Sequence, residues 1–530
     1  MNSTKKPQVW LPLLFSITLI IGMMLGYKMR DGMPGKPYFS VDKTKPLQEL
    51  MELIKAKYVD EVKMNELADT AIAAILGKLD PHSVYIPAGD VQELNEDIAG
   101  NFFGIGVEFD VINDTINIMH VVPDGPSAKA GVQAGDKFIK VNDTAVAGVK
   151  IKEDKIKKLL RGPNATQVAI DILRGNKKKK ITIQRGIIPV SSVDAAYMME
   201  PGTGYIRLNK FSQVSYREFM QKLEKLKGQG LQKLILDLRN NSGGVLDQAT
   251  EIADEFLDGD KLITYTAGAK FPKKEYRCKR PGLFEQGKLV LLCDEGTASA
   301  SEILLGALQD WDRATIIGRR SFGKGLVQEQ YDLGDGSALR LTIARYYTPL
   351  ERSIQRPYIK GEKAYYDEIL NRFHDGEMVT MDSIKNDTIK KYQTPSGKIV
   401  YGGGGISPDV FVPIDTTKTG SAITKLYYKG TLYNFAYTYF LGNKSELHSF
   451  KTIQEFSDKF SITQDTWQQF EALSLKDSVM VSELSTKEKD ELSFRLKAAI
   501  ARQVWRNEGL YEVLNTKDDA IKKALEVLRK

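Results

Sequence analysis

The sequence predicts a multidomain α/β protein with an apolar N-terminal segment, a helical region, a small β-rich domain, an α/β layer domain and a helical C-terminal region. Three observations predict this class. The chain has 530 residues, which is too many for one hydrophobic core. Its residues are 42% hydrophobic and 27% charged, as in ordinary globular proteins. The spacing of apolar residues also changes along the chain, from helical to alternating and then to strands followed by helices.

The first element is an uncharged apolar run at residues 9–27. As a helix with a rise of about 1.5 Å per residue it would be about 28 Å long, enough to cross a bilayer. A cleaved signal peptide is the alternative, but no Ala-x-Ala-like site ends the run and no cysteine follows to accept a lipid. We therefore expect an uncleaved single-pass transmembrane anchor. Basic residues flank both ends, so the placement of the body outside the cytoplasm follows from the anchor being N-terminal.

The next two regions differ in their apolar period. Residues 38–100 carry apolar residues at helical spacing, in runs such as "LQELMELIKAKYV", and we expect two or three amphipathic helices there. Over residues 101–187 the runs alternate, as in "FFGIGVEFDV" and "QVAIDIL", and turns separate them. This predicts a compact β-rich domain with two short helices.

Strands and helices alternate over residues 188–414. "KLILDLRNN" precedes "GGVLDQATEIADEFL", and "KLVLLCDEG" precedes "TASASEILLGALQDW". Buried strands that are each followed by a helix are typical of an α/β layer structure. Residues 415–530 are rich in charged residues and are predicted to form a helical C-terminal extension. Three roles fit this extension: an oligomerisation element, a docking element for an adaptor or activator, and a helical brace.

The composition excludes some partners and cofactors. The net charge of +7 is small for this length and no basic helix is interleaved with aromatic residues, so we expect no nucleic-acid partner. The phosphate-loop pattern Gly-x-x-x-x-Gly-Lys-Ser/Thr is absent, so ATP is not implied. Cys278 and Cys293 fit neither a metal site nor a redox motif. Two interpretations fit: a disulfide between them or, as the apolar run before Cys293 favours for that residue, a small buried cysteine in a strand.

A serine-rich turn is the first candidate for chemistry. In "DEGTASASEI", residues 294–303, a strand ends and a helix begins, so side chains project beside helix N–H groups that can stabilise negative charge. Ser299 and Ser301 both lie there. Because serine and threonine are also preferred helix N-caps, this run alone fits a nucleophile or a cap.

A serine nucleophile needs a base. There are four histidines, and no Gly-x-Ser-x-Gly elbow occurs. In "RRSFGKGLVQEQ", Lys324 lies between two glycines, where burial would favour the neutral amine that can accept a proton. Gln328 is four residues further on and could orient that amine. Read alone, Gly-Lys-Gly is most often an exposed turn.

A glycine-rich turn is the third element. "LILDLRNNSGG" ends a buried strand, and its glycine N–H groups could stabilise an oxyanion.

Together, "LDLRNNSGG", "GTASASEI" and "GRRSFGKGLVQ", preceded by "FFGIGVEF" and "GPSAKAGVQAGDKFIKVND", closely resemble the carboxyl-terminal processing (tail-specific) proteases. These are serine peptidases of the S41 family with an inserted PDZ domain. The resemblance covers about residues 45–413, and "GGGISPDVFVP" matches the end of the family core. It implies a PDZ domain over residues 101–187 and a crotonase/Clp-like α/β protease core over residues 188–414.

The resemblance also implies site residues. The family nucleophile is the serine 25 residues before the lysine of "FGKG", which is Ser299, and Ser301 is then structural. Lys324 is implied as the general base and Gln328 as the residue that orients it. The family uses neither a metal nor another cofactor, nor a catalytic histidine.

The implied oxyanion hole is the backbone N–H of Ala300 and of a glycine of "NNSGG", where we favour Gly244 over Gly243. His82, in "LDPHS", matches a family motif to which we assign a structural role.

In the implied PDZ domain, Ile105, Gly106 and Val107 resemble the loop whose N–H groups bind a peptide's terminal carboxylate. The expected partners are protein substrates with free, apolar C-termini, and an adaptor, an activator or a second copy of the chain also fit. The expected location is a bacterial inner membrane, with the catalytic body in the periplasm. Two rival functions are a catalytically silent PDZ scaffold that binds C-termini and a serine hydrolase that uses His82.

Overall fold

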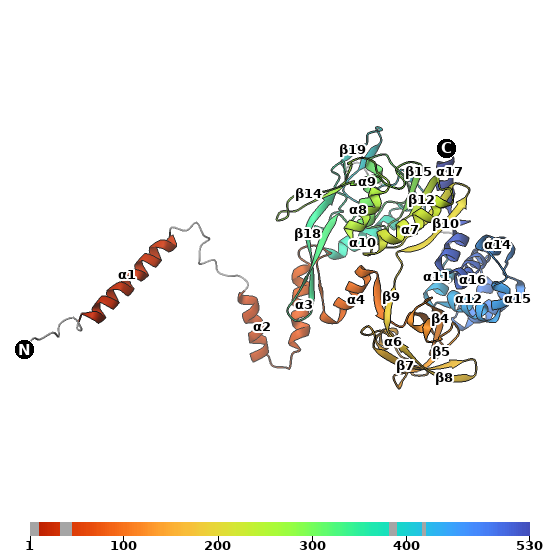
Figure 1. Cartoon of the computed structure of the whole chain (residues 1–530), viewed down its shortest axis with the longest axis horizontal. Helices are drawn as coiled ribbons and strands as arrows, with labels where there is room; N and C mark the ends of the chain where they lie inside the picture. The colour runs from red at the N-terminus through yellow and green to blue at the C-terminus, as the bar shows by residue number, and fades with distance from the viewer. Residues whose placement is uncertain (1–9, 32–44, 381–389, 416–419) are drawn as a thin grey trace, which may run out of the picture. The chain divides into compact units, whose positions relative to one another are not determined.

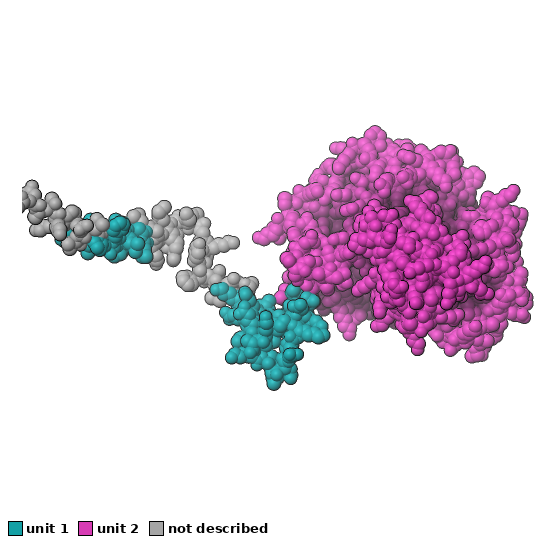
Figure 2. All heavy atoms as spheres, turned by 60° about the horizontal axis from the view of Figure 1, so that its bottom comes forward, with its two compact units in different colours: residues 1–72 teal, residues 73–530 magenta. Residues whose placement is uncertain are grey.

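A computed structural model describes residues 10–31, 45–380, 390–415 and 420–530. The chain divides into two compact units, residues 1–72 and 73–530 (Figure 2). The first unit contains α1 (Leu11–Asp31), α2 (Lys45–Lys57) and most of α3 (Met64–Leu76). Residues 38–44 of the predicted helical region lie outside the described residues.

The predicted membrane anchor is not supported. Most of residues 9–27 lie in α1, which extends past the apolar run to Asp31, while residue 9 lies outside the described residues. Within the described part of the chain, no helix combines the length and the apolar character needed to cross a membrane.

The predicted β-rich domain contains one main sheet, in the order β3-β4-β5-β7-β8, with β6 beside β5. Because β3 is at the end of this order, one of its edges has no strand partner in the sheet. β2 and β9 form a separate antiparallel pair. The bounds are β2 (Asn101–Gly104), β3 (Val107–Ile112), β4 (Thr115–Val121), α5 (Pro126–Lys129), β5 (Lys137–Val141), β6 (Thr144–Ala145), α6 (Glu153–Leu160), β7 (Gln167–Arg174), β8 (Lys177–Gln184) and β9 (Gly186–Pro189).

The predicted α/β layer is a six-stranded sheet in the order β10-β11-β12-β15-β16-β21, which is parallel from β11 onward. Neighbouring residues of β12 belong to different hydrophobic clusters: Leu234 and Leu236 pack with helices α7, α8 and α9, and Ile235 packs with α17 (Asp519–Arg529). The sheet is therefore covered on both faces. The bounds are β10 (Val193–Glu200), β11 (Thr203–Leu208), α7 (Ser215–Gly228), β12 (Lys233–Asp237), α8 (Leu246–Asp254), β15 (Lys288–Cys293), α9 (Ala300–Asp310), β16 (Thr315–Gly318) and β21 (Val410–Phe411).

A second sheet brings an N-terminal segment to the core. Strand β1, which follows "DPHS", pairs antiparallel with β18, more than 200 residues later in the sequence. β18 also pairs with β13 and β17. The bounds are β1 (Val84–Ile86), α4 (Ala88–Ala99), β13 (Leu262–Ala267), β14 (Lys274–Arg277), β17 (Leu326–Asp332), β18 (Ala338–Tyr347), α10 (Glu362–His374), β19 (Lys391–Gln393) and β20 (Ile399–Tyr401).

The C-terminal region is helical, as predicted, and has its own hydrophobic core (Figure 1, blue). Its long helix α16 has a kink at Arg506, whose φ of 61° and ψ of −152° are not helical. Residues 416–419 lie outside the described residues. The bounds are α11 (Ser421–Tyr428), α12 (Thr431–Gly442), α13 (Lys444–Leu447), α14 (Ile453–Lys459), α15 (Gln464–Lys476), a 3-10 helix (Val481–Glu483), α16 (Thr486–Asn515) and α17 (Asp519–Arg529).

The two cysteines are free and buried, so they do not form a disulfide in this structure. Cys293 is the last residue of β15, in agreement with the buried-strand interpretation.

Candidate active site

Ser299 lies on a strained turn between β15 and α9. It is the N-cap residue of α9 and has a φ of 56°, a conformation that non-glycine residues seldom adopt and that occurs often at functional sites. Ala298 and Ala300 are buried, whereas Ser299 is partly exposed. Ser301 is fully buried, and its hydroxyl donates to the backbone carbonyl of Asn241 at 3.0 Å. The turn thus presents one serine and uses the other to hold the fold.

Lys324 is held by the predicted orienting residue. Its Nζ donates to Oε1 of Gln328 at 2.9 Å, and Nε2 of Gln328 donates to the carbonyl of His82. Because the carbonyl of His82 can only accept, Gln328 must turn its oxygen toward the amine. Burial lowers the pKa of Lys324, and Arg340 acts in the same direction.

One buried carboxylate joins the serine turn to the lysine loop. Oε2 of Glu302 accepts from the backbone N–H of Ser299 and from that of Lys324, both at 2.8 Å. Oε1 accepts from the hydroxyl of Ser321 and from the N–H of Gly323 at 2.7 Å. Burial raises the pKa of Glu302, and these donors oppose that rise. The backbones of residues 299 and 324 therefore meet at a single oxygen atom.

Sequence reasoning missed Glu302, although a signal was present. A serine followed three residues later by glutamate at a helix start is the capping-box pattern, which places the carboxylate at the backbone N–H of the serine. Tyr346, whose hydroxyl lies within hydrogen-bond distance of the carbonyls of both Ser299 and Lys324, had no such signal.

The glycine turn packs directly against Ser299. A Cβ atom placed on Gly243 would lie 2.8 Å from Cβ of Ser299 and 2.6 Å from the carbonyl oxygen of Ala298. The N–H of Gly243 already donates to Oδ1 of Asn241 at 2.9 Å. Among the hydrogen bonds of the described residues, none uses the N–H of Gly244. That of Ala300 is the first of α9 and has no acceptor within the helix.

His82 supports this arrangement through its backbone and is itself neutral. Its Nε2 atom lies 2.9 Å from the hydroxyl of Tyr365, and its ring packs edge-on against Phe322. Burial, followed by the charge of Lys324, lowers the pKa of His82 to about 4.

The predicted carboxylate-binding loop lies before the open edge of β3. Gly106 has a φ of 74°, in the left-handed region that favours glycine. The carbonyls of Ile105 and Gly106 accept from Ser127 at 2.9 Å and from Val122 at 3.0 Å. These two carbonyls are therefore bonded within the domain, and the next residue, Val107, begins the edge strand.

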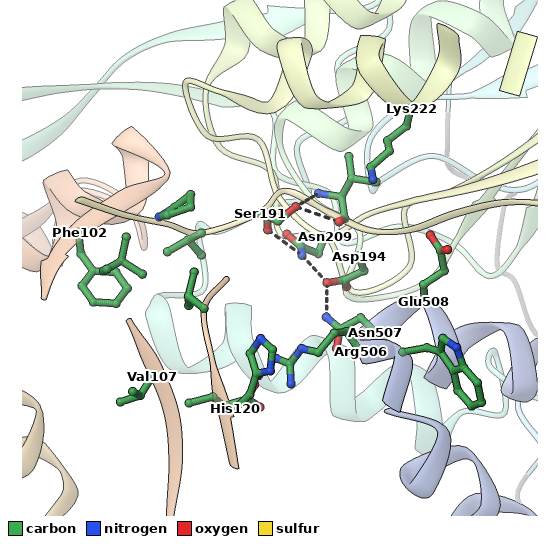
Figure 3. Close-up of a pocket in the computed structure, with 17 residues that line it drawn as sticks. Phe102, Val107, His120, Ser191, Asp194, Asn209, Lys222, Arg506, Asn507 and Glu508 are labelled. Carbon is green, nitrogen blue, oxygen red and sulfur yellow. Dashed lines mark hydrogen bonds and ion pairs between the residues drawn. The ribbon is translucent and has the colours of Figure 1, made fainter. Parts of the chain in front are cut away.

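A cavity of about 720 Å³ separates the β-rich domain from the α/β core and α16 (Figure 3). Ser299 and Lys324 are not among its lining residues. In its wall, Glu108 of β3 accepts from Nη2 of Arg502 at 2.6 Å and also from Arg506. No sequence pattern predicted this cavity. It is lined by Phe102, Val107, Glu108, His120, Val122, Ile188, Pro189, Val190, Ser191, Val193, Asp194, Asn209, Lys222, Trp505, Arg506, Asn507 and Glu508.

Three family models match the chain. Residues 202–362, which contain Gly244, Ser299, Ala300, Lys324 and Gln328, match peptidase family S41. Residues 118–174 match the PDZ domain model, and this match begins after the loop of Ile105. Residues 422–506 match a family of unknown function, DUF8443.

Two named relatives agree with these matches. The carboxy-terminal-processing protease of Bartonella bacilliformis is 36% identical over 58% of this chain and 71% of its own length. A Staphylococcus epidermidis protein named "Probable CtpA-like serine protease" is 32% identical over 64% of this chain and 68% of its own length. The solved photosystem II D1 C-terminal processing protease is 26% identical and covers 70% of this chain and 93% of its own, with a TM-score of 0.35.

Proposed function

Because the chain belongs to peptidase family S41, the family of its carboxy-terminal-processing serine protease relatives, we propose that it cleaves proteins with a Ser299–Lys324 dyad, without ATP, and selects them by their C-terminal tails. The observation that carries the dyad is the shared carboxylate of Glu302, because it holds the backbones of both residues.

The proposed reaction starts with attack of Ser299 Oγ on the scissile carbonyl carbon. The neutral amine of Lys324 takes the hydroxyl proton and later gives it to the leaving amine. The N–H groups of Gly244 and Ala300 stabilise the oxyanion, because neither donates to the protein in the contacts above. Water then hydrolyses the acyl-enzyme, with Lys324 again acting as the base.

Tail selection is assigned to the loop of Ile105, Gly106 and Val107. Its N–H groups would bind the terminal carboxylate, and the peptide would add as a strand to the open edge of β3. ATP independence rests on the absence of a phosphate-loop pattern from the sequence.

The test uses the full chain and an unstructured protein with an apolar C-terminus. We expect Ser299→Ala and Lys324→Ala to lower kcat/KM by at least about 10³-fold, since either change removes a group that acts in the transition state. Wild type should cleave the free-acid tail faster than the amidated tail. Gel densitometry with mass spectrometry of the products measures both effects.

Ser301→Ala is the matched control for the serine. It deletes a buried hydroxyl that bonds Asn241, so we expect a less stable protein that retains activity. Near-wild-type cleavage by Lys324→Ala would refute the dyad. If wild type binds tails without cleaving them, even with candidate activators added, the silent scaffold is the better description.

A further inference from the structure

The turn that carries Gly243 and Gly244 is fixed at its start by Arg239. β12 ends at Asp237, a fully buried carboxylate. Two guanidinium nitrogens of Arg239 donate to it, Nε to Oδ1 at 3.0 Å and Nη2 to Oδ2 at 2.7 Å. The backbone N–H of Arg239 also donates to Oδ1 at 3.0 Å. Both the backbone and the side chain of Arg239 are thus held by one carboxylate.

The remaining guanidinium nitrogen reaches the C-terminal extension. Nη1 of Arg239 donates to Oδ2 of Asp518 at 2.8 Å. The other oxygen of Asp518 caps α17, accepting from the N–H groups of Ala520 at 2.9 Å and Ile521 at 3.0 Å. Because α17 packs on one face of the core sheet, Asp518 is held in place by that packing.

The rest of the turn transmits the position of Arg239 to the serine. The carbonyl of Arg239 accepts from Nη2 of Arg207 at 2.9 Å. Two residues later, the side-chain oxygen of Asn241 accepts from Gly243, and its carbonyl accepts from Ala298 at 2.9 Å. Hydrogen bonds of Asn241, two residues after Arg239, thus connect the glycine turn to the turn of Ser299.

We propose that Asp518 is a positioning residue for catalysis: through Arg239, the C-terminal extension holds the glycine turn at the place where the oxyanion forms. The extension would then have a role in positioning the glycine turn, which its sequence did not predict. The proposal rests on the proposed function, because it assigns the oxyanion donor to that turn.

Asp518→Asn in the full chain is the direct test. Asparagine keeps the size and the oxygen that caps α17, but it removes the charge that faces Arg239. We expect kcat to fall about tenfold with KM within about twofold, less than the 10²-fold or more that loss of a whole oxyanion donor costs. The affinity for a peptide aldehyde, whose Ser299 adduct places its oxygen in the oxyanion hole, should fall in parallel.

Arg529→Gln is the matched control. Arg529 also joins the extension to the core, through Glu200 at 2.6 Å. Glu200 lies opposite Thr203, the first residue of β11. It is therefore at the end of the strands opposite to the glycine turn, which follows the last residue of β12. We expect this variant to keep the wild-type kcat, so a general loosening of the extension can be told apart from an effect on the turn.

Hydrogen exchange over residues 238–245 separates this proposal from the proposed function. Asp518→Asn should speed exchange there and Arg529→Gln should not, whether or not wild type cleaves a substrate. If Asp518→Asn exchanges this turn at the wild-type rate and also has an unchanged kcat, the positioning role is overturned. A wild type that does not cleave, but shows the exchange difference, would refute only the proposed protease mechanism.

Discussion

At the scale of single residues, the site depends on groups whose hydrogen-bonding role, as donor or as acceptor, is fixed by their partners. Gln328 must present its oxygen to Lys324 because the carbonyl of His82 accepts from its amide nitrogen. Glu302 receives four donors and therefore acts as an acceptor at both oxygens. The amine is thus oriented by a neutral group, and burial of Lys324 lowers its pKa.

Gln328→Glu tests the protonation state of Lys324. A carboxylate beside the amine would stabilise the ammonium and raise the pKa of Lys324, so less neutral base would exist at a given pH. We expect the acid limb of the kcat/KM profile to move to higher pH by about one pH unit or more. Glu329→Gln is the control, because Glu329 bonds Tyr331 at the surface and its loss should leave the limb in place. An unmoved limb in Gln328→Glu would contradict a lysine base.

At the scale of elements, the sequence was informative where the pattern is local. Strand β15, the serine turn and helix α9 follow from one buried run, one glycine and one helical run. No local pattern predicted the pairing of β1 with β18. Nor did a local pattern predict where the 3-10 helix and α17 lie in the fold. Such contacts join residues far apart in the chain, and periodicity shows which face of an element is buried but not which element covers it.

The contact between the glycine turn and Ser299 gives a prediction at this scale. Gly243→Ala would place a methyl group 2.6 Å from the carbonyl oxygen of Ala298, at a φ of 95°. We expect the turn of Ser299 to shift and kcat to fall about 10²-fold, with the fold retained by circular dichroism. Gly259→Ala, at a φ of 71° and with no atom within 4 Å, carries the backbone strain alone and should keep wild-type kcat. Equal kcat values for the two variants would count against the proposed oxyanion turn.

At the scale of the whole molecule, the C-terminal extension contacts both other folded regions of residues 73–530. Two contacts join it to the β-rich domain. Arg502 donates to Glu108 of that domain, and the hydroxyl of Tyr437 donates to the carbonyl of Ile118 at 3.1 Å. It reaches the core through Asp518 and through Asn507, which donates to Asp194 at 2.7 Å. In sequence these charged and polar residues resemble ordinary solvent-exposed ones, so their contacts could not be predicted from composition.

Glu108→Gln measures the contact between the β-rich domain and α16. Burial alone would raise the pKa of Glu108, but Arg502 and Arg506 outweigh it and the pKa is lowered. The ion pairs therefore stabilise the fold above the ordinary glutamate pKa, and this contribution is lost as pH falls through the lowered value. Because these side chains are partly exposed, we expect a cost of only about 1 kcal/mol at neutral pH, diminishing with acid and with salt.

Urea unfolding followed by tryptophan fluorescence measures this difference, since Trp505 lines the same cavity as Glu108 and Arg506. Glu153→Gln, which removes an exposed pair within α6, should change stability by less than about 0.5 kcal/mol. A cost for Glu108→Gln that grows toward acid would show that the ion pairs are not its source.

The most direct test of the central claim is to identify the residue that becomes acylated. The full chain is mixed with a peptide p-nitrophenyl ester, quenched in acid and mapped by mass spectrometry. The proposed dyad predicts an acyl adduct on Ser299 that is absent from Ser299→Ala and forms far more slowly in Lys324→Ala. An adduct on another residue, or one that forms at the wild-type rate without Lys324, would contradict it.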